Sequence, residues 1–151
     1  MDTTTIDKGT ETREKAIALL RFLGREALDF EQASYDDNVW ESGNIEYMVL
    51  TDEEADEKAT DYIKDSLWAF NPSFLSNYCD LPETIFTALQ PQCESANEAI
   101  LALVDRDEYG IESFVEDAIS CDGRGRFMSS YDGNEEEVKI NNTYYYIYRI
   151  N

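Results

Sequence analysis

The stretch that decides the fold is residues 45–70, IEYMVLTDEEADEKATDYIKDSLWAF, in which the character of the chain changes at Thr51. Residues 45–50 are a short run of β-prone residues, which predicts a strand. Glu54 follows Thr51 by three positions, the spacing of a capping box, so we expect a helix to begin there. This helix is expected to run to about residue 70.

Helices are also predicted on both sides of this stretch. Apolar residues at three- and four-residue spacing predict a helix over residues 10–33. Its apolar face would carry Ala16, Leu20, Leu23, Ala27 and Phe30. Asn71 and Pro72 are suited to the N-cap and first position of a short helix ending near residue 78. Asp80 with Glu83 opens another segment by the same logic, and further helices are expected around residues 96–104 and 111–118.

The end of the chain changes to β-type sequence after Gly123. Strands are predicted over residues 126–131 and 143–150, with a turn at 132–134. Together the elements predict an α+β fold, with several helices packed on a small antiparallel sheet that ends in a C-terminal β-hairpin. Residues 1–9 are expected to form a flexible N-terminus, and residues 10–151 a single acidic domain.

Composition narrows the classes of function. The formal net charge of -21 argues against direct binding to nucleic acid or to an anionic membrane, and favours basic partners or cations. The three cysteines form no C-x-x-C pair, and no apolar run is long enough to span a bilayer, so we expect a cytoplasmic protein with reduced thiols. The chain has no histidine, the commonest general base, and no carboxylate pair stands out, so neither an enzyme nor a cofactor is predicted.

The negative charge is concentrated in one segment. Residues 29–65 carry thirteen acidic and two basic residues, whereas residues 1–28 carry five of each. In the helix predicted after Thr51, carboxylates four residues apart rise about 6 Å along the axis. A nucleic-acid strand presents phosphates at about 3.4 Å of axial rise per nucleotide, and their separation is larger because the strand winds. The two spacings are comparable, so these carboxylates can stand in for phosphates.

The predicted partner-binding residues form a strip of carboxylates on and before this helix. They are Asp36, Asp37, Glu41, Glu46, Glu53, Glu54, Glu57, Asp61 and Asp65. Like charges at this spacing oppose helix formation, whereas a merely soluble surface would mix signs. The strip therefore favours a protein that mimics nucleic acid and fills the basic groove of a DNA- or RNA-handling protein. Oligomeric state stays open, with a homodimer as one option.

Other interpretations compete with mimicry. The acidic face can be simply solvated or a halophilic adaptation, or the chain can be a regulatory interaction module that binds through its aromatic C-terminal sheet. Residues 105–116 resemble part of an EF-hand loop, with Gly110 sixth and Glu116 twelfth, but Tyr109 replaces the oxygen ligand at position five. This favours a plain turn, and cation binding stays open. Arg124 and Arg126 lie in a glycine-bearing turn that can grip a phosphate, although an intramolecular salt bridge is favoured.

Two segments resemble a known class of small acidic proteins. The ending DGRGRFMSSYDGNEEE followed by YYYIYRIN, and the segment VLTDEEADEKATDYIKDSLWAF, resemble small acidic proteins of uncertain function encoded by bacteriophages and other mobile elements. Such elements often carry acidic inhibitors of host defence nucleases that act as DNA mimics, as anti-restriction and some anti-CRISPR proteins do. The resemblance implies a host-cell inhibitor, and it transfers no site residue.

Overall fold

The computed structural model describes residues 8–106 and 110–151. The chain divides into two compact units. We name them the sheet unit, which comprises the residues up to Glu57 and from Arg124 onward, and the helical unit, Lys58–Gly123. The division falls inside helix α2 (Asp52–Asp65), so the acidic segment contributes residues to both units.

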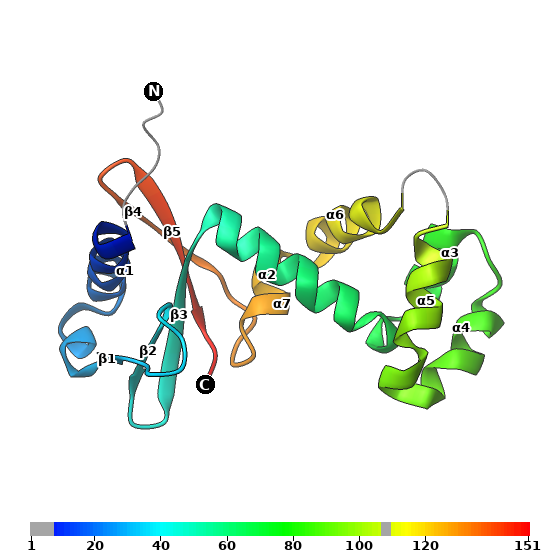
Figure 1. Ribbon diagram of the computed structural model, residues 1–151, viewed down its shortest axis with the longest axis horizontal. Helices are drawn as coiled ribbons and strands as arrows, with labels where there is room; N and C mark the ends of the chain where they lie inside the picture. The colour runs from blue at the N-terminus through cyan, green and yellow to red at the C-terminus, as the bar shows by residue number, and fades with distance from the viewer. Residues whose placement is uncertain (1–7, 107–109) are drawn as a thin grey trace. The chain divides into compact units, whose positions relative to one another are not determined.

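The sheet unit is built on an antiparallel sheet, which in the described residues has five strands in the order β1-β2-β3-β5-β4 (Figure 1). The strands are β1 (Glu31–Gln32), β2 (Val39–Ser42), β3 (Ile45–Thr51), β4 (Glu136–Ile140) and β5 (Thr143–Arg149). Strand β3, from the first third of the chain, pairs with β5, near its C-terminus. The register runs from Tyr47 opposite Arg149 to Thr51 opposite Tyr145. The α+β class and the C-terminal hairpin, β4–β5, are confirmed.

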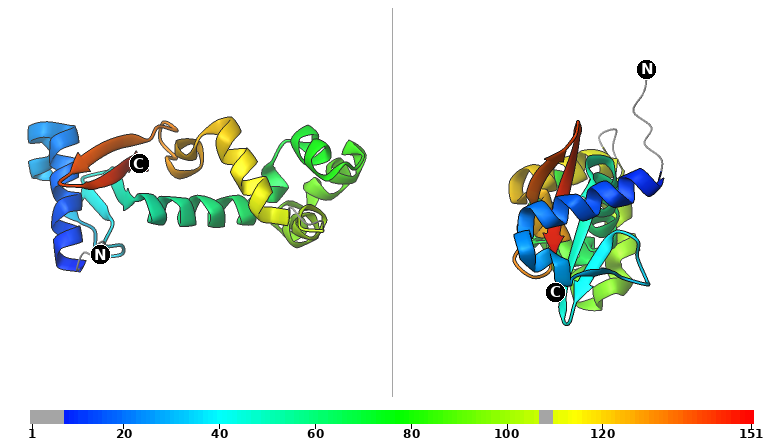
Figure 2. Two further views of the ribbon diagram at one scale, coloured as in Figure 1. Left: turned by 90° about the horizontal axis from the view of Figure 1, so that it is seen from above. Right: turned by 90° about the vertical axis from the view of Figure 1, so that its left-hand side faces the viewer.

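Helix α1 (Lys8–Leu23) covers one face of this sheet (Figure 2). Its inward residues Ala18 and Leu19 belong to the buried core of that face. The strand residues of the same core are Trp40, Val49, Ile140, Tyr145 and Ile147.

The prediction for this helix was wrong in two respects. Ala16 and Leu20, expected on its apolar face, are exposed, and Glu14 and Lys15 are buried instead. The helix also ends at Leu23, because Gly24 adopts a left-handed φ of +65°, and a 3₁₀ segment, η1 (Gly24–Asp29), follows. Leu23, Ala27 and Phe30 do pack against the core as partly buried residues.

The opposite face of the sheet carries Leu50 and Tyr148, both fully buried. Short helix α7 (Arg124–Met128) lies near this face, since the Arg124 guanidinium is 4.6 Å from the centre of the Tyr146 ring. The strand predicted over residues 126–131 is therefore wrong. Gly125 allows the close approach of α7 to the following backbone, because a Cβ there would lie 2.7 Å from the Gly133 carbonyl oxygen.

The start of α2 is confirmed as a capping box. The Thr51 N–H donates to Glu54 Oε1 at 2.9 Å, and the Glu54 N–H donates to Thr51 Oγ1 at 3.2 Å. The helix ends at Asp65, earlier than predicted, and a 3₁₀ turn η2 (Leu67–Ala69) follows.

The helical unit packs short helices around an aromatic cluster. Its elements are α3 (Pro72–Cys79), α4 (Glu83–Leu89), η3 (Gln90–Ala96), α5 (Asn97–Val104) and α6 (Gly110–Asp122). Phe114 is fully buried, and its ring makes edge contacts with Phe70, Phe74 and Tyr78 at 5.2 to 5.3 Å between centroids.

Of the two helix starts predicted from capping residues in this unit, one is confirmed and the other is wrong. Asn71 caps α3 with its side chain, accepting from the Ser73 N–H at 2.8 Å, and Pro72 begins the helix, as predicted. Asp80 does not open α4. It ends α3 in the left-handed conformation, with a φ of 55°, and α4 begins after Pro82.

Candidate acidic interaction surfaces

Three glutamates lie directly opposite one another across three strands of the sheet unit. Glu31 of β1 pairs with Glu41 of β2, and Glu41 pairs with Glu46 of β3. Directly opposite residues of antiparallel strands hold their Cβ atoms about 4.5–5.5 Å apart on the same face, and like charges so placed are destabilising. We name these three residues the glutamate ladder.

An exposed tyrosine lies beside the ladder. Tyr35, in the β1–β2 connection, is 63% exposed and hydrogen-bonds with Glu46. Desolvation at this contact, the hydrogen bond and the charges of Glu46, Glu41 and Asp36 raise the pKa of the Tyr35 hydroxyl. The phenol therefore stays protonated at neutral pH, and the surface combines carboxylates with a neutral aromatic ring.

Some carboxylates in the first turns of α2 form ion pairs within the sheet unit. Arg124, whose side chain is only 10% exposed, pairs with Asp52 at 2.9 Å, Asp56 at 2.7 Å and Glu135 at 2.6 Å. Burial by itself would lower the pKa of Arg124, but the hydrogen bonds that its guanidinium donates to these three carboxylates raise the pKa above its ordinary value. The intramolecular salt bridge favoured for Arg124 is thereby confirmed, while Arg126 is exposed.

Glu54 is likewise engaged within the unit. It pairs at 2.8 Å with Lys15, whose side chain is 3% exposed. Burial would raise the pKa of Glu54, but the hydrogen bonds from Lys15 and Thr51 outweigh it and lower the pKa. Lys15 also donates to Asn38 Oδ1 at 2.7 Å, so the loop with Asp36 and Asp37 lies beside the start of α2.

The remaining predicted carboxylates of α2 point to solvent. In the sheet unit, Glu53 and Glu57 are exposed and form no ion pair with any described residue. In the helical unit, Asp61 and Asp65 are exposed as well. Tyr62, on the same helix, is 53% exposed.

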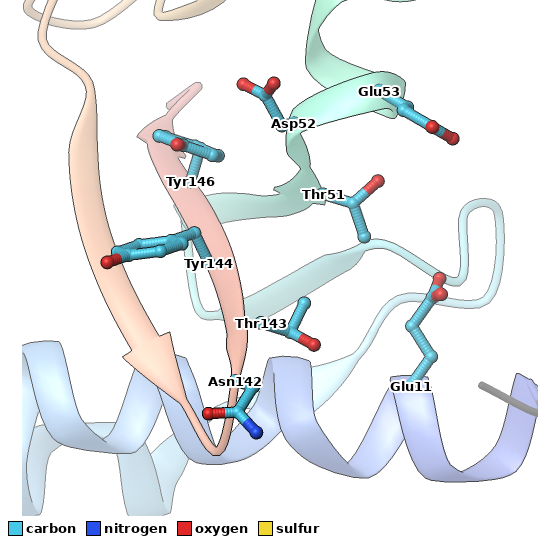
Figure 3. A pocket seen from close by; sticks show the side chains of 8 residues that line it. All are labelled: Glu11, Thr51, Asp52, Glu53, Asn142, Thr143, Tyr144 and Tyr146. Atoms are coloured by element: carbon cyan, nitrogen blue, oxygen red, sulfur yellow. The ribbon is translucent and has the colours of Figure 1, made fainter. Parts of the chain in front are cut away.

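A cavity of about 400 Å³ opens where β3, the β4–β5 hairpin and the starts of α1 and α2 meet (Figure 3). Its lining is rich in hydrogen-bond acceptors and hydroxyl groups: Glu11, Thr51, Asp52, Glu53, Asn142, Thr143, Tyr144 and Tyr146. Glu11 is paired with Lys15 and Asp52 with Arg124, whereas Glu53 is the carboxylate of the lining that forms no ion pair with a described residue. Such a lining suits an ammonium or guanidinium group better than an anion.

The tyrosines of the C-terminal strand β5 expose little aromatic surface to a partner. Tyr145 and Tyr148 are fully buried, and their hydroxyls donate to Glu14 and Glu135. Burial, then these hydrogen bonds, raise the pKa of both tyrosines, so both remain neutral donors. Tyr144, 45% exposed, is the tyrosine of β5 with a substantial accessible face.

The EF-like interpretation of residues 105–116 falls partly outside the described residues, because 107–109 are not among them. Asp105 Oδ1 accepts the Ile111 N–H at 2.9 Å at the start of α6. Within residues 8–106 and 110–151, no group of three potential metal-ligating side chains comes together.

The structure thus brings Glu41 and Glu46 together and adds Glu31, which sequence reasoning missed. The two-residue strand β1 has no pattern that predicts it, so its register with β2 was not visible. No family model, curated protein or solved structure matches this chain. In the described part of the chain, no helix has the length and apolar character needed to cross a bilayer.

Proposed function

We propose that this chain is an acidic inhibitor that mimics nucleic acid and occupies the basic groove of a DNA- or RNA-handling protein. The observation that carries the proposal is the glutamate ladder, Glu31–Glu41–Glu46. Direct opposition of like charges destabilises a sheet, so selection for stability alone would not favour three in a row. A basic partner that binds them all would offset this repulsion.

The ladder also has suitable spacing and chemistry. Neighbouring strands lie about 4.8 Å apart, so the three carboxylates form a row roughly 10 Å long. The distance of about 4.8 Å between neighbouring carboxylates is comparable with the spacing of phosphates along a nucleic-acid strand, whose axial rise is about 3.4 Å per nucleotide. Arginine binds carboxylates and phosphates with the same bidentate geometry, so one set of arginines serves both ligands.

Tyr35 adds a feature that a row of charge alone lacks. Its exposed ring beside Glu46 can stack on a guanidinium group, as a nucleic-acid base does. Glu53 and Glu57, which are exposed in the same unit, extend the negative potential, whereas Glu54 is neutralised by Lys15. In the helical unit, Asp61 and Asp65 are proposed partner contacts on their own account, by their exposure and their i+4 spacing on α2.

The resemblance to phage and mobile-element proteins supports a host-defence nuclease as the target, met in the host cytoplasm. On this proposal the chain acts by binding alone and requires no cofactor. Its affinity would come from electrostatic attraction and from counterion release, and it would weaken as salt rises.

Competition with DNA tests the proposal. A panel of restriction and CRISPR nucleases is bound to a labelled DNA duplex, and fluorescence polarisation is followed as this protein is added at fixed salt. Mimicry of nucleic acid predicts that the apparent Kd of the duplex for one of them rises in proportion to inhibitor concentration, without a plateau. A ternary complex of nuclease, duplex and this protein would refute mimicry.

Matched variants locate the surface. E31Q/E41Q/E46Q removes the charge of the ladder, and E94Q/E98Q/E116Q removes the same charge from exposed positions of the helical unit. The ladder variant should lose competition and the control should retain it. Equal loss in both would show that total charge, and not the ladder, drives binding.

A further inference from the structure

The outward face of α1 carries an apolar stripe that the core of the chain does not use. Ile17 is 45% exposed and Leu20 is 41% exposed, and Ala16, one helical turn before Leu20, is exposed as well. Leu28, in the 3₁₀ segment that follows, is 73% exposed. Because Ala18 and Leu19 face the sheet, this stripe belongs to the opposite side of the helix.

The exposed charges of α1 itself have the sign opposite to that of the whole chain, whereas exposed Glu26 and Asp29 flank Leu28 in the 3₁₀ segment. Within α1, every described charged residue that is exposed is basic: Lys8, Arg13 and Arg21. The carboxylates of the helix are bound inward, Glu11 to Lys15 and Glu14 to Asn141 and Tyr145. A chain of net charge -21 therefore presents one apolar helix face edged by arginines.

We infer that this α1 face docks onto the glutamate ladder of a second copy of the chain. The ladder is negative where α1 is positive, and it has one exposed aromatic neighbour, Tyr35, which hydrogen-bonds with Glu46 and is 63% exposed. Contact between two α1 faces would set arginine against arginine, so complementarity requires α1 of one copy and the ladder of the other.

The dimensions of the two surfaces agree. Arg13 and Arg21 are eight residues apart, which places them about 12 Å apart along the helix axis. The ladder spans roughly 10 Å across three strands, so both arginines can reach its terminal glutamates while Ile17 and Leu20 lie between them. Arg21 uses one nitrogen to donate to the Lys139 carbonyl at 2.7 Å, and the other donors of its guanidinium, which bond to no described residue, can bind a carboxylate.

The two surfaces lie on opposite faces of one sheet. α1 packs on the face that carries Trp40, and side chains alternate along β2, so Glu41 points to the other face. One copy cannot satisfy its own ladder with its own α1. The contact is head-to-tail, and it generates rings or short chains rather than a two-fold dimer. This inference does not depend on the proposed function, although a nuclease bound at the ladder would exclude the second copy.

A charge exchange tests the inference with the full-length chain. Sedimentation velocity of the wild type over about a hundredfold concentration range should show association that grows with concentration. R13E/R21E and E41R/E46R should each associate at least about tenfold more weakly than the wild type, because either variant brings like charges together at the contact. Mixing the two variants should restore association, since each copy then offers the opposite charge to the other.

Controls separate the contact from charge and folding effects. K58E/R126E changes the net charge as much as R13E/R21E does, at exposed positions of other helices, and should associate like the wild type. I17S/L20S alters no charge and should weaken association, with circular dichroism confirming the fold. A wild type that stays monomeric throughout, or a mixture of the two charge variants that does not associate, would overturn the inference.

Discussion

Replacing Arg124 by Gln should destabilise the sheet unit by about 3 kcal/mol. The hydrogen bond to Glu135, whose side chain is 27% exposed, is charge-assisted and contributes about 2 kcal/mol. Asp52 and Asp56 are more than 60% exposed, so each pair contributes only about 0.3 kcal/mol. Contact with the Tyr146 ring adds about 0.5 kcal/mol.

The measurement uses the sheet unit's own tryptophan. Trp40 is buried there, and Trp68 belongs to the helical unit, so a Trp68→Phe background leaves one reporter for urea unfolding. Arg126→Gln is the matched control, because Arg126 lies on the same helix and is exposed, and it should change stability by less than about 0.5 kcal/mol. If both variants lower the free energy of unfolding equally, the Arg124 network does not hold the unit together.

Two further predictions concern pH and charge. The lowered pKa of Glu54 means that its pairing stabilises the folded state above the unfolded value of about 4.3, and that this contribution is lost as pH falls through the lower folded pKa. Glu54→Gln should therefore destabilise the chain at neutral pH by more than it does near pH 3 or so, and a pH-independent difference between the two unfolding curves would contradict this assignment. E31Q/E41Q/E46Q should raise the free energy of unfolding by a few tenths of a kcal/mol per relieved pair at low salt, with the gain shrinking as salt screens the charges. A loss of stability in that variant, measured in the same urea titration, would show that the glutamates do not repel one another.

Local chemistry made part of this protein predictable. The capping box of Thr51 and Glu54 and the Asn71 cap before Pro72 depend on atoms within three residues, so the sequence alone specified where α2 and α3 begin. The α+β class followed from the change between β-type and helical segments. The net charge of -21, from which a basic partner is predicted, is a property of composition and needs no fold.

Tertiary structure decided which face of α1 is buried and which residues the charged side chains contact. Periodicity places Ala16 and Leu20 in a core, but Glu14 and Lys15 are buried instead, because the sheet unit offers them hydrogen-bond partners: Asn141, Tyr145, Asn38 and Glu54. Of the carboxylates predicted as one strip, Glu54 is neutralised by Lys15, while Glu41 and Glu46 gain Glu31 as a third member. The physical reason is that a salt bridge or a cross-strand register joins residues distant in sequence, and only the packed sheet specifies which of them meet.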